Sequence, residues 1–76
     1  MKAFILVNIR TGDIENVIAH LKRLESVSDA YMTFGPYDAV AIVETQDVNI
    51  LGRTLATKIQ PIPGVLETLT CIAVDE

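Results

Sequence analysis

The hydrophobic pattern changes its period along this 76-residue chain, and this change constrains the fold more than any other feature. Runs rich in β-branched residues predict four strands, at 3–9, 27–34, 39–44 and 65–74. Apolar residues spaced three and four apart predict two amphipathic helices, one from Ile14 to near Glu25-Ser26 and one following Asp47. The order β-α-β-β-α-β predicts an α+β, ferredoxin-like sandwich. Its four-stranded antiparallel sheet should carry both helices on one face.

Turn and capping residues separate these segments. The sequence Thr-Gly-Asp at 11–13 should end the first strand and cap the first helix through a hydroxyl or carboxylate, as Asp47 should for the second. Pro61 and the pair at 63–64 should end the second helix. Between the two halves, Gly35-Pro36-Tyr37-Asp38 predicts a tight turn, so the flanking strands should form an antiparallel hairpin.

Both faces of the predicted sheet are apolar, although two helices can cover only one of them. The first strand places Ala3, Ile5, Val7 and Ile9 opposite Phe4 and Leu6, and the third places Ala39, Ala41 and Val43 opposite Val40 and Ile42. The fourth places Leu66, Ile72 and Val74 opposite Val65, Leu69, Cys71 and Ala73. An uncovered apolar face on the order of several hundred Å² is more than a soluble monomer normally tolerates. We therefore predict self-association through the sheet, face to face or edge to edge.

Composition narrows the class of protein. The length allows one domain, residues 1–76. Ten acidic and six scattered basic residues give a net charge of −4, so no direct contact with nucleic acid is expected. A single cysteine excludes an internal disulfide and fits a reducing, cytoplasmic location. The apolar runs are far shorter than the ~20 residues of a membrane span, so no membrane association is expected.

The sequence contains no pattern typical of a catalytic site. His20, the only histidine, lies off the apolar stripe of the first helix and should be solvated, and Cys71 should be a buried, unreactive thiol in a central strand. Metal-ligand spacings and glycine-rich phosphate loops are not found. We therefore predict no catalytic residue, no metal, no cofactor and no enzymatic activity.

Asp38 is the acid whose position suggests a function. It follows a tight turn at the start of a strand, where it is either a turn cap or part of a polar recess. In such a recess, backbone N–H groups would bind a carboxylate while Asp38 pairs with an ammonium, as the head of an amino acid requires. Thr68 and Thr70 form a second polar feature on one face of the last strand, although threonine is common in strands.

Three segments together resemble a known family. They are Ala3-Phe4-Ile5-Leu6-Val7, Gly35-Pro36-Tyr37-Asp38, and Ile59-Gln60-Pro61-Ile62-Pro63-Gly64-Val65 with Thr68-Leu69-Thr70. They resemble the C-terminal effector-binding domain of the Lrp/AsnC feast/famine regulators, the regulation of amino-acid metabolism domain, over essentially the whole chain. The resemblance implies dimers formed through the sheets, octameric or decameric rings of dimers, and amino-acid effectors bound between dimers. It implies a ligand site at Thr33, Phe34, Gly35, Pro36, Tyr37, Asp38, Thr68 and Thr70.

The family's regulators also carry an N-terminal helix-turn-helix domain, whereas the resemblance here starts at the first strand. We therefore expect a stand-alone amino-acid-binding module that does not itself bind DNA. It would act on transcription through its ligand or by co-assembly with full-length regulators. Two alternatives remain open at this stage: a small dimeric α+β barrel enzyme, and a structural adaptor without a ligand.

Overall fold

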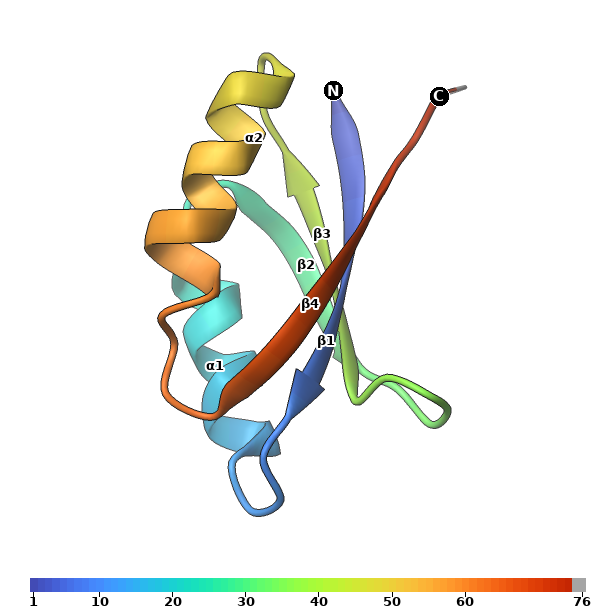
Figure 1. Cartoon of the computed structure of the whole chain (residues 1–76), viewed down its shortest axis with the longest axis vertical. Helices are drawn as coiled ribbons and strands as arrows, with labels where there is room; N and C mark the ends of the chain where they lie inside the picture. The colour runs from blue at the N-terminus through green and yellow to red at the C-terminus, as the bar shows by residue number, and fades with distance from the viewer. Residues whose placement is uncertain (75–76) are drawn as a thin grey trace.

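Four strands and two helices form the two layers of the computed structural model, which describes residues 1–74 (Figure 1). The elements in chain order are β1 (Lys2–Ile9), α1 (Ile14–Arg23), β2 (Val27–Met32), β3 (Ala39–Glu44), α2 (Val48–Thr54), the π-helical turn η1 (Leu55–Ile59) and β4 (Val65–Ile72). The sheet has the order β2-β3-β1-β4, and all neighbouring strands are antiparallel. Both helices cover the same face of the sheet (Figure 1). The predicted ferredoxin-like fold is confirmed.

The core lies between the sheet and the helices and follows the two periods read from the sequence. Along β1, every second side chain is buried from Ala3 to Ile9, and in α1 Val17 and Leu21, four residues apart, are fully buried. The other buried apolar side chains come from β2, β3, α2, η1 and one loop: Val27, Ala30, Ala39, Ala41, Val43, Leu51, Ile59 and Ile62. Strand β4 contributes only the partly buried Val65. Burial of these apolar side chains holds both helices against the same face of the sheet.

Several element ends differ from the prediction. β2 ends at Met32, so residues 33 and 34 belong to the following loop, and α1 ends at Arg23, about two residues early. The Asp47 cap is confirmed, because its Oδ1 accepts the Ile50 N–H at 2.8 Å. The cap predicted at Asp13 is wrong: its carboxylate makes no capping bond and instead accepts from Arg10 Nε at 2.8 Å.

A register shift in the β1–β4 ladder changes the face of one predicted residue. Leu6 pairs with Leu69 and Val7 with Thr68, but beyond Asn8 the ladder shifts so that Ile9 pairs with Val65. Val65 therefore packs against the core, although strict alternation placed it on the other face with Leu69. A bulge moves a side chain to the other face because it adds one unpaired residue.

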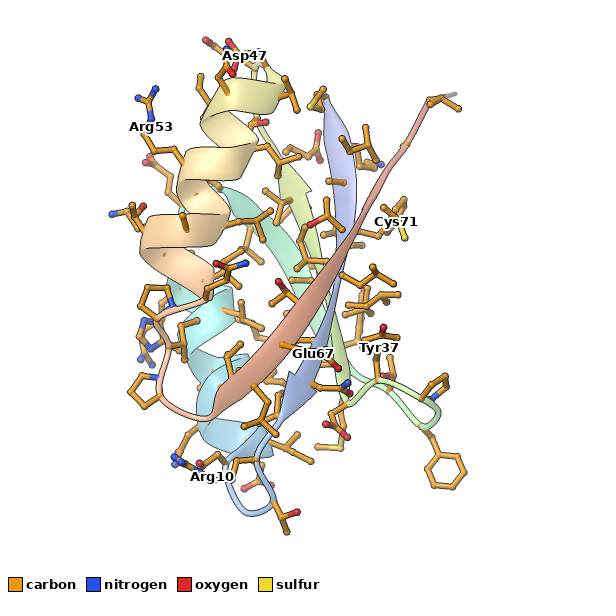
Figure 2. All side chains as sticks on the ribbon, in the orientation of Figure 1. Arg10, Tyr37, Asp47, Arg53, Glu67 and Cys71 are labelled. Atoms are coloured by element: carbon orange, nitrogen blue, oxygen red, sulfur yellow. The ribbon has the colours of Figure 1, made fainter. Side chains whose placement is uncertain are left out.

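The uncovered face of the sheet is apolar, as the sequence predicted. Cross-strand pairing places seven largely apolar side chains in its middle, and we call this set the open face: Phe4, Leu6, Tyr31, Val40, Ile42, Leu69 and Cys71. The polar or charged residues on the same side of the sheet are Lys2, Asn8, Asp29, Glu44 and Glu67. In Figure 2, Cys71 lies on the side of the sheet away from the helices. The prediction of a buried thiol in a central strand is wrong, because β4 is an edge strand and Cys71 is exposed.

Candidate functional site

The loop 33–38, between β2 and β3, is held at its base by Thr33. The Thr33 N–H donates to the Asp38 C=O at 3.0 Å, and the Thr33 hydroxyl donates to the Tyr37 C=O at 2.7 Å. These two bonds close a six-residue connection, longer than the four-residue turn that the sequence predicted, and the hairpin itself is confirmed. Thr33 thus shapes the loop through two of its own polar groups.

Asp38 extends the β1–β3 ladder beyond its last residue pair. Its N–H donates to the Val7 C=O at 2.9 Å, and its Oδ2 accepts the Ile9 N–H at 2.7 Å. The carboxylate therefore replaces the strand carbonyl that would otherwise accept from Ile9. Asp38 is a structural cap, but the cap is on β1 rather than within its own turn. Among residues 1–74, no group donates a hydrogen bond to its second oxygen, Oδ1.

The outer part of the loop presents unpaired backbone donors. Within the described part of the chain, the N–H groups of Phe34, Gly35 and Tyr37 donate to no protein acceptor. Pro36 has no N–H, and the Phe34 side chain is fully exposed, at 107% of its reference area. Figure 2 shows Tyr37 on the side of the sheet away from the helices. These three N–H groups are therefore available to an acceptor from outside the chain.

Thr68 and Thr70 lie elsewhere. They pair with Val7 and Ile5 on the helix-covered face of β4, and both are half-buried. Thr68 Oγ1 accepts from Gln60 Nε2 at 3.2 Å. Asp38 and β4 are separated by two strand spacings, or about 10 Å at 4.7–4.9 Å per spacing. One chain therefore does not bring the threonines and the 33–38 loop into a single site.

A carboxylate–phenol pair on β2 was missed by sequence reasoning. The Tyr31 hydroxyl donates to Asp29 Oδ2 at 2.5 Å, and the Ala30 N–H donates to Asp29 Oδ1 at 2.8 Å. The Tyr31 hydrogen bond, with help from the Ala30 N–H, lowers the pKa of Asp29, and the same bond raises the pKa of Tyr31. The two residues are two apart on one strand face, a spacing that could have identified them.

No group of three or more His, Cys, Asp or Glu side chains within residues 1–74 is arranged to hold a metal ion. His20 is half-buried rather than fully solvated, because it lines a hollow with the loop around Pro63. None of the helices in this part of the chain is long and apolar enough to cross a membrane.

Comparison with known proteins decides the family. Residues 2–76 match the Lrp/AsnC ligand binding domain. The chain belongs to the Lrp/AsnC family. Two relatives are described as HTH-type transcriptional regulators: Ptr1 of Methanocaldococcus jannaschii, 39% identical over 57 residues, and FL11 of Pyrococcus abyssi, 36% identical over 72 residues. The matches cover 75% and 95% of this chain but only 38% and 47% of the two relatives, so the chain spans less than half of each regulator.

Solved structures of the Lrp/AsnC fold agree closely with this one. TTHA0845 from Thermus thermophilus has a TM-score of 0.93 at 31% identity, and the match covers 99% of this chain and 94% of that one. AsnC from E. coli has a TM-score of 0.93 at 29% identity, over 99% of this chain and 51% of AsnC. NMB0573 from Neisseria meningitidis, solved as an L-Met complex, shares the fold at a TM-score of 0.89, 21% identity and coverage of 99% and 50%.

Proposed function

We propose that this Lrp/AsnC domain is an amino-acid-binding regulatory module that assembles through its open face. It holds its ligand between copies and acts on transcription through ligand-dependent assembly or co-assembly with full-length regulators, without contacting DNA itself. The observation that carries the proposal is the apolar open face, which the helices leave uncovered. The match to a ligand binding domain and the regulator relatives support the regulatory role.

The energetics of the sheet favour pairing by the open face. Phe4, Tyr31 and Leu69 are 37%, 51% and 47% exposed, although each is a large apolar or aromatic side chain. Burying such area stabilises an assembly by roughly 25 cal/mol per Å². Pairing by the β2 edge is less favourable, because the Ala30 N–H of that strand already donates to Asp29 Oδ1 and is not available to a second strand. A face-to-face dimer is therefore the expected unit.

The 33–38 loop supplies the recognition groups for an amino acid. The free N–H groups of Phe34, Gly35 and Tyr37 suit the ligand carboxylate, and Asp38 Oδ1 suits its ammonium. A protein of the same fold, NMB0573, is known as an L-Met complex. Thr68 and Thr70 would join this site only from another copy, since they lie on the opposite face of the same chain. A ligand at such a junction stabilises the assembly that completes its site.

Asp38→Asn tests the ligand site without removing the cap. The amide oxygen can still accept the Ile9 N–H, but the charge that would pair with an ammonium is gone. Calorimetry against the twenty amino acids should detect binding to the wild-type chain, weakened about 10-fold or more in Asp38→Asn, since a charged hydrogen bond contributes ~1.5–3 kcal/mol. Asp47→Asn is the matched control, because Asp47 also accepts a backbone N–H, at the start of α2.

Light scattering with and without each amino acid tests the coupling. The proposal expects the mass of the particle to change with the ligand that binds. Assembly without binding of any of the twenty would contradict the sensing role and would instead support a structural adaptor. A folded monomer at micromolar concentration would contradict the assembly itself.

A further inference from the structure

Two adjoining hollows lie on the helix layer, between α1 and the connection that leads from η1 to β4. The first has a volume of about 310 Å³ and is lined by Arg10, by His20 and Arg23 of α1, and by the connection. The second has a volume of about 300 Å³ and includes Lys58 of η1 in its lining. Both hollows are lined by His20 and Ile62, so they adjoin, and we call the pair the basic hollow.

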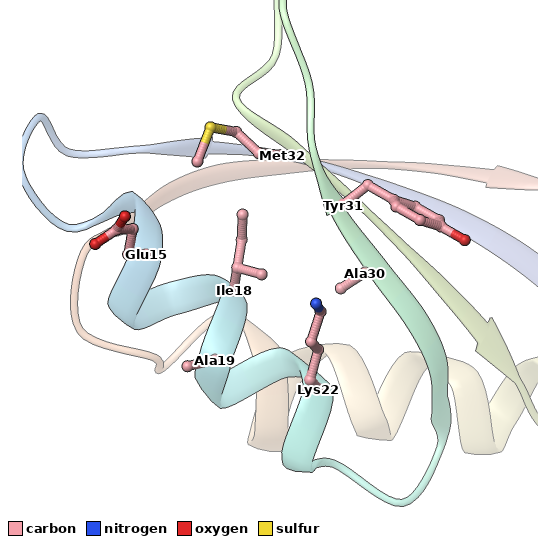
Figure 3. A pocket seen from close by; sticks show the side chains of 7 residues that line it. All are labelled: Glu15, Ile18, Ala19, Lys22, Ala30, Tyr31 and Met32. Atoms are coloured by element: carbon pink, nitrogen blue, oxygen red, sulfur yellow. The ribbon is translucent and has the colours of Figure 1, made fainter.

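The basic hollow concentrates positive charge on a chain whose net charge is −4. Its lining includes the only histidine and three of the six Lys and Arg residues of the chain, namely Arg10, Arg23 and Lys58. Asp13 is the one acidic side chain of residues 1–74 that lines it. The hollow between α1 and β2 in Figure 3 differs, because Glu15 and Lys22 give it one charge of each sign. Cations gathered in one recess stabilise an anion that lies among them.

Most donors of the basic hollow have no partner in the protein. Within residues 1–74, the side chains of His20, Arg23 and Lys58 form no hydrogen bond or ion pair. Arg10 donates through Nε alone, to Asp13 Oδ2 at 2.8 Å, and both of its Nη groups are unpaired. A guanidinium carries five N–H donors and an ammonium carries three, so these groups can bind acceptors from outside the chain.

Arg10 is held in position by the corner between β1 and α1. Its N–H donates to the Gly64 C=O at 2.7 Å, and its C=O accepts the Asp13 N–H at 3.0 Å. Asp13 lies directly against Gly64, since a Cβ at position 64 would be 2.7 Å from the Asp13 Cβ. The Asp13 carboxylate, which does not cap α1, is thereby placed to hold Arg10 Nε. A guanidinium that is already held in this way loses less freedom when it binds a ligand.

The α1 side of the basic hollow is one face of the helix. Asn16, Ala19, His20 and Arg23 are spaced three and four residues apart, so their side chains form one row. Side chains on a helix lean toward its start, which directs Arg23 toward the end of α1 where Arg10 lies. The opposite wall includes Lys58 on the π-helical turn η1, a rare backbone form that is frequent at functional sites.

We propose that the basic hollow binds a small phosphate ester, such as a nucleoside monophosphate. Guanidinium groups from two separate segments, Arg10 and Arg23, suit the three terminal oxygens of a phosphate. One guanidinium alone already satisfies the two oxygens of a carboxylate. The size of the hollow matches that of small-molecule sites, about 300–1,000 Å³, and leaves room for an organic body beside the phosphate. Ala19, Ile62 and Pro63 supply apolar lining for that body.

Calorimetry with adenosine 5′-monophosphate, inorganic phosphate and adenosine tests the site. The monophosphate should bind, inorganic phosphate should bind more weakly, and adenosine should bind least. Arg10→Gln and Arg23→Gln should each weaken binding of the monophosphate about 10-fold or more, because each removes a charged hydrogen-bond donor. Ala19→Trp, at an exposed position on α1, should also weaken it by filling the hollow without a change of charge.

Two matched controls lie outside the basic hollow. Arg53→Gln makes the same substitution on α2, and Figure 2 shows Arg53 and Arg10 at opposite ends of the helix layer. Lys22→Gln removes a charge next to Arg23 in the sequence, but Lys22 lines the other hollow. Both variants should bind adenosine 5′-monophosphate as the wild-type chain does, and circular dichroism confirms that every variant is folded.

Several outcomes would overturn the inference. They are no binding of either phosphate compound, equal affinity for adenosine 5′-monophosphate and adenosine or inorganic phosphate, and equal losses in Arg23→Gln and Arg53→Gln. Basic residues in the last turn also offset the dipole of α1, so lower stability of Arg23→Gln with unchanged affinity would likewise contradict the site. Tighter binding of a short DNA duplex than of the monophosphate would assign the hollow to a nucleic-acid backbone instead.

The inference does not rest on the proposed function. The basic hollow lies on the helix layer, whereas the open face lies on the other side of the sheet. Asp38→Asn should therefore bind adenosine 5′-monophosphate with the wild-type affinity while its amino-acid binding is weakened. Failure of amino-acid binding or of assembly would leave binding at the hollow unchanged, so the two failures are distinguishable.

Discussion

Leu6→Lys should separate the copies that pair through the open face. Leu6 lies at the centre of that face, between Val40 on β3 and Leu69 on β4, and it is half-buried in a single copy. Full burial of a leucine contributes about 1.5–3 kcal/mol. Pairing would bury roughly the exposed half of the Leu6 side chain on each copy. Truncation of Leu6 should therefore reduce the free energy of dimer formation by about 1.5–3 kcal/mol, summed over both copies.

The lysine adds the cost of two unpaired ammonium groups, which is several kcal/mol per buried ion even after some relaxation. The total is at least about 5 kcal/mol, which weakens dimer formation by about 10³-fold or more. Leu6→Ala, which lacks the charge, should weaken it only about 10- to 100-fold. The fold of one copy should change little, because the substituted side chain points out of the core.

Sedimentation over a range of concentrations measures the effect, with circular dichroism to confirm folding. The Leu6→Lys chain should sediment near its single-copy mass of 8.3 kDa at concentrations where the wild-type chain is larger. Val48→Lys, at an exposed apolar position on α2, should leave association unchanged. An unchanged association of Leu6→Lys, or equal effects of the two lysine variants, would refute the reasoning.

Three further predictions follow from particular contacts. Gly64 and Gly12 both have positive φ, but a Cβ at Gly64 would lie 2.7 Å from a neighbouring aspartate Cβ, while one at Gly12 would meet nothing within 4 Å. In chemical denaturation, Gly12→Ala should therefore lower the free energy of unfolding by about 1–2 kcal/mol, and Gly64→Ala should lower it clearly more. Equal losses of stability in the two variants would contradict the predicted clash at Gly64. Tyr31→Phe should return the lowered pKa of Asp29 toward its ordinary value in an NMR titration. Because the pKa of Asp29 is lowered in the folded state, the Asp29–Tyr31 bond stabilises the fold above the unfolded-state pKa, and this contribution is lost as the pH falls through the folded-state pKa. An Asp29 pKa that does not move in Tyr31→Phe would contradict the assignment. Cys71, exposed in one copy, should react slowly with a thiol reagent in the wild-type assembly and faster once the open face is unpaired, and equal rates would argue against its burial between copies.

The period of the sequence predicted the elements well because it depends on near neighbours. Alternation along β1 and β3 separated the buried side chains from Phe4, Leu6, Val40 and Ile42, and the hairpin followed from the breakers between β2 and β3. The Asp47 cap was predictable for the same reason, since its partner is three residues away.

The candidate site was only partly predictable, because its contacts join distant segments. Asp38 was identified by its place after a turn, but its partner Ile9 is 29 residues away. Asp13 was assigned to a helix cap, although Arg10 takes its carboxylate. Residues that are matched to one family site can also lie apart, as Thr68 and Asp38 do in a single chain.

The sequence by itself determined which segments are strands and helices, and that one face of the sheet would be left apolar. Only the tertiary structure decided that β4 is an edge strand with Cys71 exposed, that a bulge turns Val65 inward, and that basic side chains from separate segments line adjoining hollows beside α1. The physical reason is that periodicity records which side of an element is apolar. The lateral order of strands and the shape of the surface depend on pairing between residues far apart in the chain.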